Sequence, residues 1–209
     1  MAMTQRIQPI LHPVRIRDLR PTQMTVGFRE VAAKREEWRN RPRDMAGKFL
    51  GSHMIPVVLG PGGDPWVIDH HHLALALHEE GVDEIMVSIV ARLDALPKKR
   101  FLAFMDSHNW LHAYDAKGKR CDFDGLPKRL ADLIDDPYRS LAGEVRHAGG
   151  YAKSPVPYTE FLWADFYRDR IKPARLTDHF SKAVAEAVPM ARSHEARYLP
   201  GWSGIDNGD

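Results

Sequence analysis

Alternating apolar and polar positions predict several short strands in the first half of the chain. Residues 10–19 (ILHPVRIRDL) alternate in this way, and so do residues 84–93 (EIMVSIVARL). Between them, the β-rich runs Ile55–Leu59 and Trp66–Ile68 flank a cluster of turn-forming residues, GPGGDP. This arrangement predicts a β-hairpin.

Two helices are expected among these strands. Residues 26–42 read as a helix in which Val26, Val31 and Trp38 stand among many charges, and Pro42 ends it. A second helix is expected from His70 to Glu80, with Asp69 in the N-cap position and Gly81 ending the helix. Residues 99–120 are expected to form an extended segment, a turn at the sequence SHN, a further strand and a DAKGKR turn.

From Leu126 onward the pattern becomes helical. Four helices are expected, at residues 126–135, 136–149, 157–171 and 176–194, the last kinked at Pro189. The aromatic side chains of the third helix have the spacing of core packing. We therefore predict an α+β fold: a small mixed sheet with packed helices over residues 1–125, followed by a helical C-terminal part, residues 126–209, with an irregular tail.

Composition narrows the class of protein. Of the 209 residues, 44% are hydrophobic and 28% are charged, as in an ordinary globular protein, and the formal net charge is +2. This charge is compatible with a phosphate-bearing ligand without requiring a nucleic acid. Cys121 is the only cysteine, which excludes an intramolecular disulfide and a cysteine-based zinc site. No signal peptide or membrane-spanning run is recognised, so we expect a cytoplasmic protein.

The candidate chemistry lies where the second strand of the hairpin meets the next helix, in VIDHHHLALALHEEGV. A metal ion shared by His70, His71 and His72 is disfavoured, because consecutive helical residues point about 100° apart. His71 and His78 share a face but lie two turns, or about 10 Å, apart. A zinc site here would need ligands from distant parts of the chain.

A phosphate site places fewer geometric requirements on the same residues than a shared metal ion does. A helix start presents backbone N–H groups and the positive end of the helix dipole, and His70, His71 and His72 add side-chain donors. Asp69 would then bind a metal ion carried by the phosphates, or act as a base. The alternative is a solvated helix end, capped by Asp69, with no chemistry. Composition leaves both interpretations open.

The segment PWVIDHHHLALAL resembles the ParB/sulfiredoxin superfamily, whose signature has the form Asp-Gly-His-His-Arg-Leu-Ala-Ala-Leu. The segments LRPTQMTVGFREVAAKREEW and DDPYRSLAGEVRHAGGYAKSPVPYTEFLWADFYR look like its ParB-like nuclease branch, so that the resemblance runs from about Val14 to Arg170. It implies a compact α+β fold whose helix start binds nucleotide phosphates. The signature carries over as Asp69, His71 and His72.

Two departures from the superfamily patterns matter for function. The sulfiredoxin cysteine is replaced by a histidine, which argues against sulfinic acid reduction. Leu73 stands where the signature arginine is expected, so that another cation must neutralise phosphate. The resemblance offers Lys34 as that cation and Glu30 as a catalytic base; alternatively, these two residues form a surface ion pair one helical turn apart. Lys153, in GGYAK, either reaches an anion or lies in an ordinary turn between helices.

Three functions are compatible with this resemblance. The first is a nucleotide-binding enzyme that transfers a phosphoryl group to a small hydroxyl-bearing acceptor, as the serine-phosphorylating relatives do, with ATP or another nucleotide and Mg²⁺. The second is a metal-dependent ParB-like nuclease, for which nucleic acid is the partner. The third is a non-catalytic nucleotide- or DNA-binding module of the partitioning type. We favour the first, because the charge is nearly balanced and no helix-turn-helix is recognised.

Overall fold

The chain folds into two compact units, each assembled from separate stretches of sequence. The structure is a computed structural model that describes residues 11–204. The first unit, here called the sheet unit, comprises the chain up to residue 24 together with residues 32–113 and 122–133. The second, here called the helical unit, comprises residues 25–31, residues 114–121 and the chain from residue 134.

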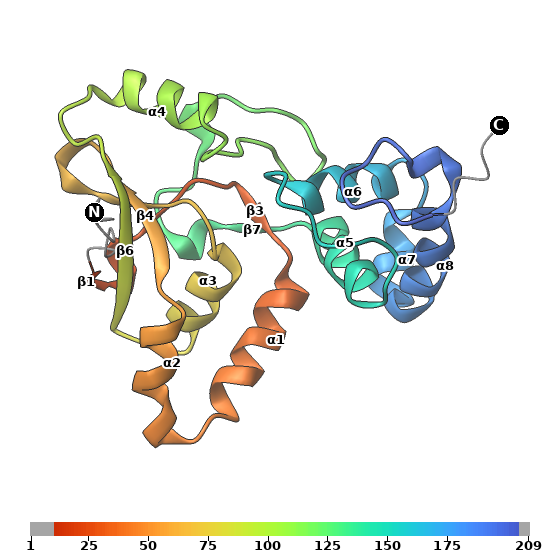
Figure 1. The fold of residues 1–209 in the computed structure, drawn as a ribbon, viewed down its shortest axis with the longest axis horizontal. Coiled ribbons are helices and arrows are strands. Elements are labelled where there is room, and N and C mark those ends of the chain that lie inside the picture. The colour runs from red at the N-terminus through yellow and green to blue at the C-terminus, as the bar shows by residue number, and fades with distance from the viewer. Residues whose placement is uncertain (1–10, 205–209) are drawn as a thin grey trace, which may run out of the picture. The chain divides into compact units, whose positions relative to one another are not determined.

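A mixed five-stranded sheet forms the centre of the sheet unit, in the order β1-β6-β4-β5-β2. Its strands are β1 (Leu11–Arg15), β2 (Arg20–Pro21), β4 (Ile55–Leu59), β5 (Pro65–Val67) and β6 (Glu84–Arg92). β4 and β5 are antiparallel, which confirms the predicted hairpin, while β4 and β6 run side by side in parallel (Figure 1). The fold is therefore α+β, as expected.

Four helices accompany the sheet: α1 (Phe28–Arg39), α2 (Ala46–Ser52), α3 (His71–Glu79) and α4 (Lys98–Ser107). The first turn of α1 is counted with the helical unit. Gly81 ends α3 as predicted: it has φ 72°, and the next N–H donates back to the carbonyl of Leu77.

Helix α4 corrects the extended segment that was expected before the turn at Ser107–Asn109. Phe101, Leu102 and Met105 lie on one helical face and are buried with Val58 of β4. Aromatic residues favour strands locally, but burial of this apolar stripe selects the helix. The turn after Ser107 is present, and the expected strand beyond it is reduced to isolated bridges at His112 and Tyr114.

The helical unit contains α5 (Pro137–His147), α6 (Thr159–Arg168), α7 (Pro173–Asp178) and α8 (Phe180–Arg192). A short parallel pair, β3 (Thr25–Val26) and β7 (Ile134–Asp135), completes it. Trp163, Phe166 and Tyr167 of α6 are almost fully buried, which confirms their predicted role in the core.

Two helix predictions in this half are wrong. Residues 126–135 form a 3-10 turn at Leu130–Asp132 and then β7, because β3 supplies the hydrogen-bonding partner for a strand there. The last predicted helix breaks at His179, whose backbone leaves the helical region, whereas Pro189 lies inside α8. Among the described helices, none is long and apolar enough to span a membrane.

Candidate functional site

The start of α3 has an unusual backbone. β5 ends at Val67, and His70 then adopts the left-handed conformation (φ 63°, ψ 27°) immediately before the first turn of the helix. A left-handed residue followed by right-handed ones turns successive N–H groups toward a common point, which suits an anion. The helix therefore starts with a left-handed residue and without a side-chain cap.

The expectation that Asp69 caps this helix is wrong. His70 is the N-cap residue, and no side chain accepts a capping hydrogen bond. The Oδ1 atom of Asp69 instead accepts from the N–H of His70, at 2.6 Å. The left-handed turn displaces Asp69 from the cap position, and its side chain stays 75% exposed.

His71 holds this junction in place. Its side chain is buried, and its Nε2 atom accepts from the backbone N–H of Thr22 at 3.2 Å. The hydroxyl of Thr22 donates to the carbonyl of Val67 at 2.6 Å, so that the end of β2, the end of β5 and α3 are joined. Burial, together with the neighbouring His72, lowers the pKa of His71 to about 3. His71 is therefore neutral near pH 7.

The remaining signature residues divide between exposed and buried positions. Asp69 and His70 face solvent, with His70 Nε2 4.0 Å from Asp69 Oδ2. His72 is 8% exposed, and Leu73, in the place of the signature arginine, is buried. Among the described residues, no three histidine, cysteine or acidic side chains gather as a metal site. Asp69 can therefore supply one carboxylate ligand to a cation.

Lys34 lies half-buried on α1, beside a group of ion pairs. The neighbouring Arg35 pairs with Glu79 and Glu80 at 2.7 and 2.6 Å, and Arg39 pairs with Glu80. These contacts bind α1 to the C-terminal end of α3, which is the end opposite the histidines.

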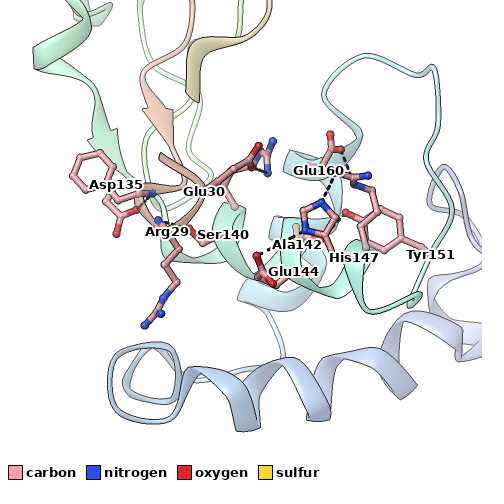
Figure 2. A network of polar contacts seen from close by, with 12 residues as sticks. Arg29, Glu30, Asp135, Ser140, Ala142, Glu144, His147, Tyr151 and Glu160 are labelled. Carbon is pink, nitrogen blue, oxygen red and sulfur yellow. Dashed lines mark hydrogen bonds and ion pairs between the residues drawn. The ribbon is translucent and has the colours of Figure 1, made fainter. Parts of the chain in front are cut away.

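Glu30 and Lys153 belong to the helical unit. The Glu30 carboxylate lies 3.3 Å from Arg139 of α5, and Arg146 lies 3.3 Å from Glu160 of α6. Figure 2 shows Glu30 and Glu160 each turned toward a guanidinium group. Lys153 is exposed and follows a glycine turn that ends α5.

Sequence reasoning missed Thr22 and the special backbone of His70. Thr22 is 49 residues from His71 in the chain, and no local pattern connects them. The left-handed backbone of His70 could have been predicted from the sequence, because the superfamily signature has glycine at this position. Glycine reaches the left-handed region without steric cost.

We expect His70→Gly to raise the free energy of unfolding by about 1 kcal/mol, because a side chain is strained at this φ and glycine is not. His70→Val should lower it, since a β-branched residue is disfavoured there. Urea denaturation of the two variants checks this. Equal stability of the Gly and Val variants would contradict the left-handed assignment.

Comparisons with known proteins show the family and the fold of the chain. Residues 12–169 match a family model described as "Putative ParB-like nuclease". The crystal structure of protein Atu1540 from Agrobacterium tumefaciens is 48% identical in sequence, covers 95% of this chain and 100% of its own, and superposes with a TM-score of 0.88. Among curated proteins, none matches the chain. Since the family model covers most of the chain, the protein belongs to the ParB-like nuclease family.

Proposed function

We propose that the protein binds the phosphate groups of a nucleotide at the start of α3 and transfers a phosphoryl group to a small hydroxyl-bearing acceptor. The observation that carries this proposal is the left-handed turn at His70, which leads directly into the helix and is held by the buried His71. Such a helix start attracts anions through its N–H groups and the helix dipole. Phosphoryl transfer depends mainly on positioning and on charge stabilisation, which the helix start and its histidines would supply in this proposal.

Each residue at the α3 start has a distinct part in the proposal. His71 acts as a positioning residue, since it is buried and neutral. In this proposal the exposed His70 would donate to phosphate oxygens, and His72, which is 8% exposed, would do so from a nearly buried position. Asp69, whose carboxylate is exposed, would provide one ligand to Mg²⁺ brought by the nucleotide, or take the proton of the acceptor.

Lys34, Glu30 and Lys153 lie outside the α3 start, and any role they have in the reaction is secondary to that of the histidines and Asp69. Lys34 is the cation that the sheet unit would offer to offset phosphate charge, and no role at the α3 start is assigned to Lys153, which belongs to the helical unit. Glu30 is less suited to act as a base, because its carboxylate already faces the guanidinium group of Arg139. Separate replacement of each residue tests these roles.

A nuclease is the second candidate, and the family description favours it. The phosphodiester of a nucleic acid would occupy the same helix start, with Asp69 on a divalent ion and a histidine as general base. The two functions share the anion site and differ in the substrate that brings the phosphate.

Titration with ATP, CTP and ADP, each with and without Mg²⁺, tests the proposal. At a nucleotide concentration about a hundredfold above Kd, the protein should gain about 3 kcal/mol of stability, seen as a higher Tm. Asp69→Asn should remove the Mg²⁺-dependent part of this gain. Asp83→Asn, an exposed acid beyond the other end of α3, serves as the matched control.

The outcomes separate the candidates. No stabilisation by any nucleotide would rule out the phosphoryl-transfer function. Metal-dependent cleavage of single-stranded or plasmid DNA, abolished by Asp69→Asn and retained in Asp83→Asn, would establish the nuclease instead.

A further inference from the structure

The sheet unit contains a cavity of about 350 Å³ that the proposed phosphate site does not use. It lies between the hairpin turn, the start of α4 and residues 123–128. Trp66, Leu102 and Phe123 contribute its apolar surface. Its volume falls in the range of small-molecule sites, which combine apolar walls with a few polar groups.

This cavity is separate from the start of α3. The ring of Trp66 packs against Phe101 of α4, with centroids 5.2 Å apart. Successive side chains of a strand point to opposite faces, so the fully buried Val67 points away from α4. A ligand beside Trp66 therefore occupies the α4 face of the sheet.

The charges around the cavity favour an anion. Lys98 lines it and is the first residue of α4, whose first turn contains no acidic residue and whose N-cap offers no side-chain hydrogen bond. Cations at a helix start are ordinarily unfavourable, because the dipole is positive there. Lys128 adds a second ammonium group to the lining. Two acids also line the cavity: Asp64 is bound by Arg20, at 3.0 Å, and Asp124 is exposed, so that the cations of the lining outnumber its acids.

We propose that this cavity is a second ligand site, which takes a planar aromatic ring carrying a negatively charged group. The ring packs on Trp66 and Phe123, and the anionic group lies at the start of α4 with Lys98 and Lys128. This inference is independent of the function proposed for the α3 start.

Calorimetric titration with four probes tests it: adenosine monophosphate and indole-3-acetate as aromatic anions, adenosine as the neutral ring, and inorganic phosphate as the anion alone. All are used without Mg²⁺. We expect at least one aromatic anion to bind at least tenfold more tightly than adenosine or phosphate. Binding of both aromatic anions indicates a general aryl-anion site, and binding of adenosine monophosphate alone indicates a nucleotide site.

Charge-reversal variants locate the binding. Lys98→Glu and Lys128→Glu should each weaken binding of the aromatic anion at least tenfold. Lys99→Glu is the matched control, because Lys99 is exposed on the same helical turn but does not line the cavity. Leu102→Trp, which fills the cavity, should abolish binding while the fold is retained, as judged by circular dichroism.

The inference would be overturned by no binding of either aromatic anion, by equal effects of Lys98→Glu and Lys99→Glu, or by adenosine binding as tightly as its monophosphate. Loss of monophosphate binding in His70→Ala but not in Lys98→Glu would place the ligand at the start of α3. That result would reject the second site and leave the proposed function standing.

Discussion

Lowering the pH from 7 to 4 is expected to reduce the free energy of unfolding by about 3 kcal/mol through His71 alone. The pKa of His71 is about 3 in the folded protein and about 6.5 in an unfolded chain. Between these values the unfolded state binds a proton that the folded state does not. Acid therefore favours unfolding, by about 1.4 kcal/mol per pH unit, and above pH 6.5 the effect vanishes.

His71→Gln isolates this contribution. A glutamine can accept the hydrogen bond from the N–H of Thr22 but does not titrate in this range. Urea denaturation at several pH values should show a shallower acid dependence for this variant than for the wild type. His78→Gln, at the other end of α3, should retain the wild-type slope.

The difference between variants is the informative quantity. Burial raises the pKa values of Asp135, Asp136 and Asp165, and protonation of these groups stabilises the folded state as the pH falls. These contributions are common to wild type and variant and cancel in the comparison. Identical acid slopes for the wild type and His71→Gln would show that His71 is not buried and neutral.

Arg139→Met should destabilise the protein by about 3 kcal/mol. The Arg139 side chain is 10% exposed and faces Glu30, which is 28% exposed. Loss of one partner of a largely buried pair leaves a carboxylate poorly solvated, and this penalty exceeds the gain from a better-packed methionine. Urea denaturation at pH 7 measures the change.

The double variant Glu30→Met with Arg139→Met should recover much of this loss, because it removes both charges. Arg146→Met is the comparison: its pair with Glu160 is 26% and 27% exposed, and solvent screening should limit the effect to about 1 kcal/mol. Equal effects at Arg139 and Arg146 would show that burial does not set the strength of the first pair.

Local sequence signals were sufficient to predict the elements that are determined by short-range interactions. Turn residues identified the β4–β5 hairpin, and Gly81 ended α3 where expected. Elements decided by distant partners were missed: α4 forms because its apolar face packs on Val58, and β7 forms because β3 lies beside it.

The candidate site shows the same division. A histidine-lined helix start could be recognised from DHHH alone. The burial of His71 and His72 could not be recognised, and the partner of His71, Thr22, lies in a separate strand segment. The superfamily signature has glycine at position 70, and glycine adopts the left-handed conformation readily. The left-handed backbone of His70 could therefore have been predicted from the signature.

The interleaved path of the chain through the two units limits how the protein can be dissected. Residues 25–31 and 114–121 belong to the helical unit, yet each is followed by chain that returns to the sheet unit. A fragment ending at residue 125 would therefore lack part of the sheet unit and keep two orphaned pieces of the other. No single cut releases either unit intact, so that truncation cannot assign an activity to one of them and point substitutions must do so.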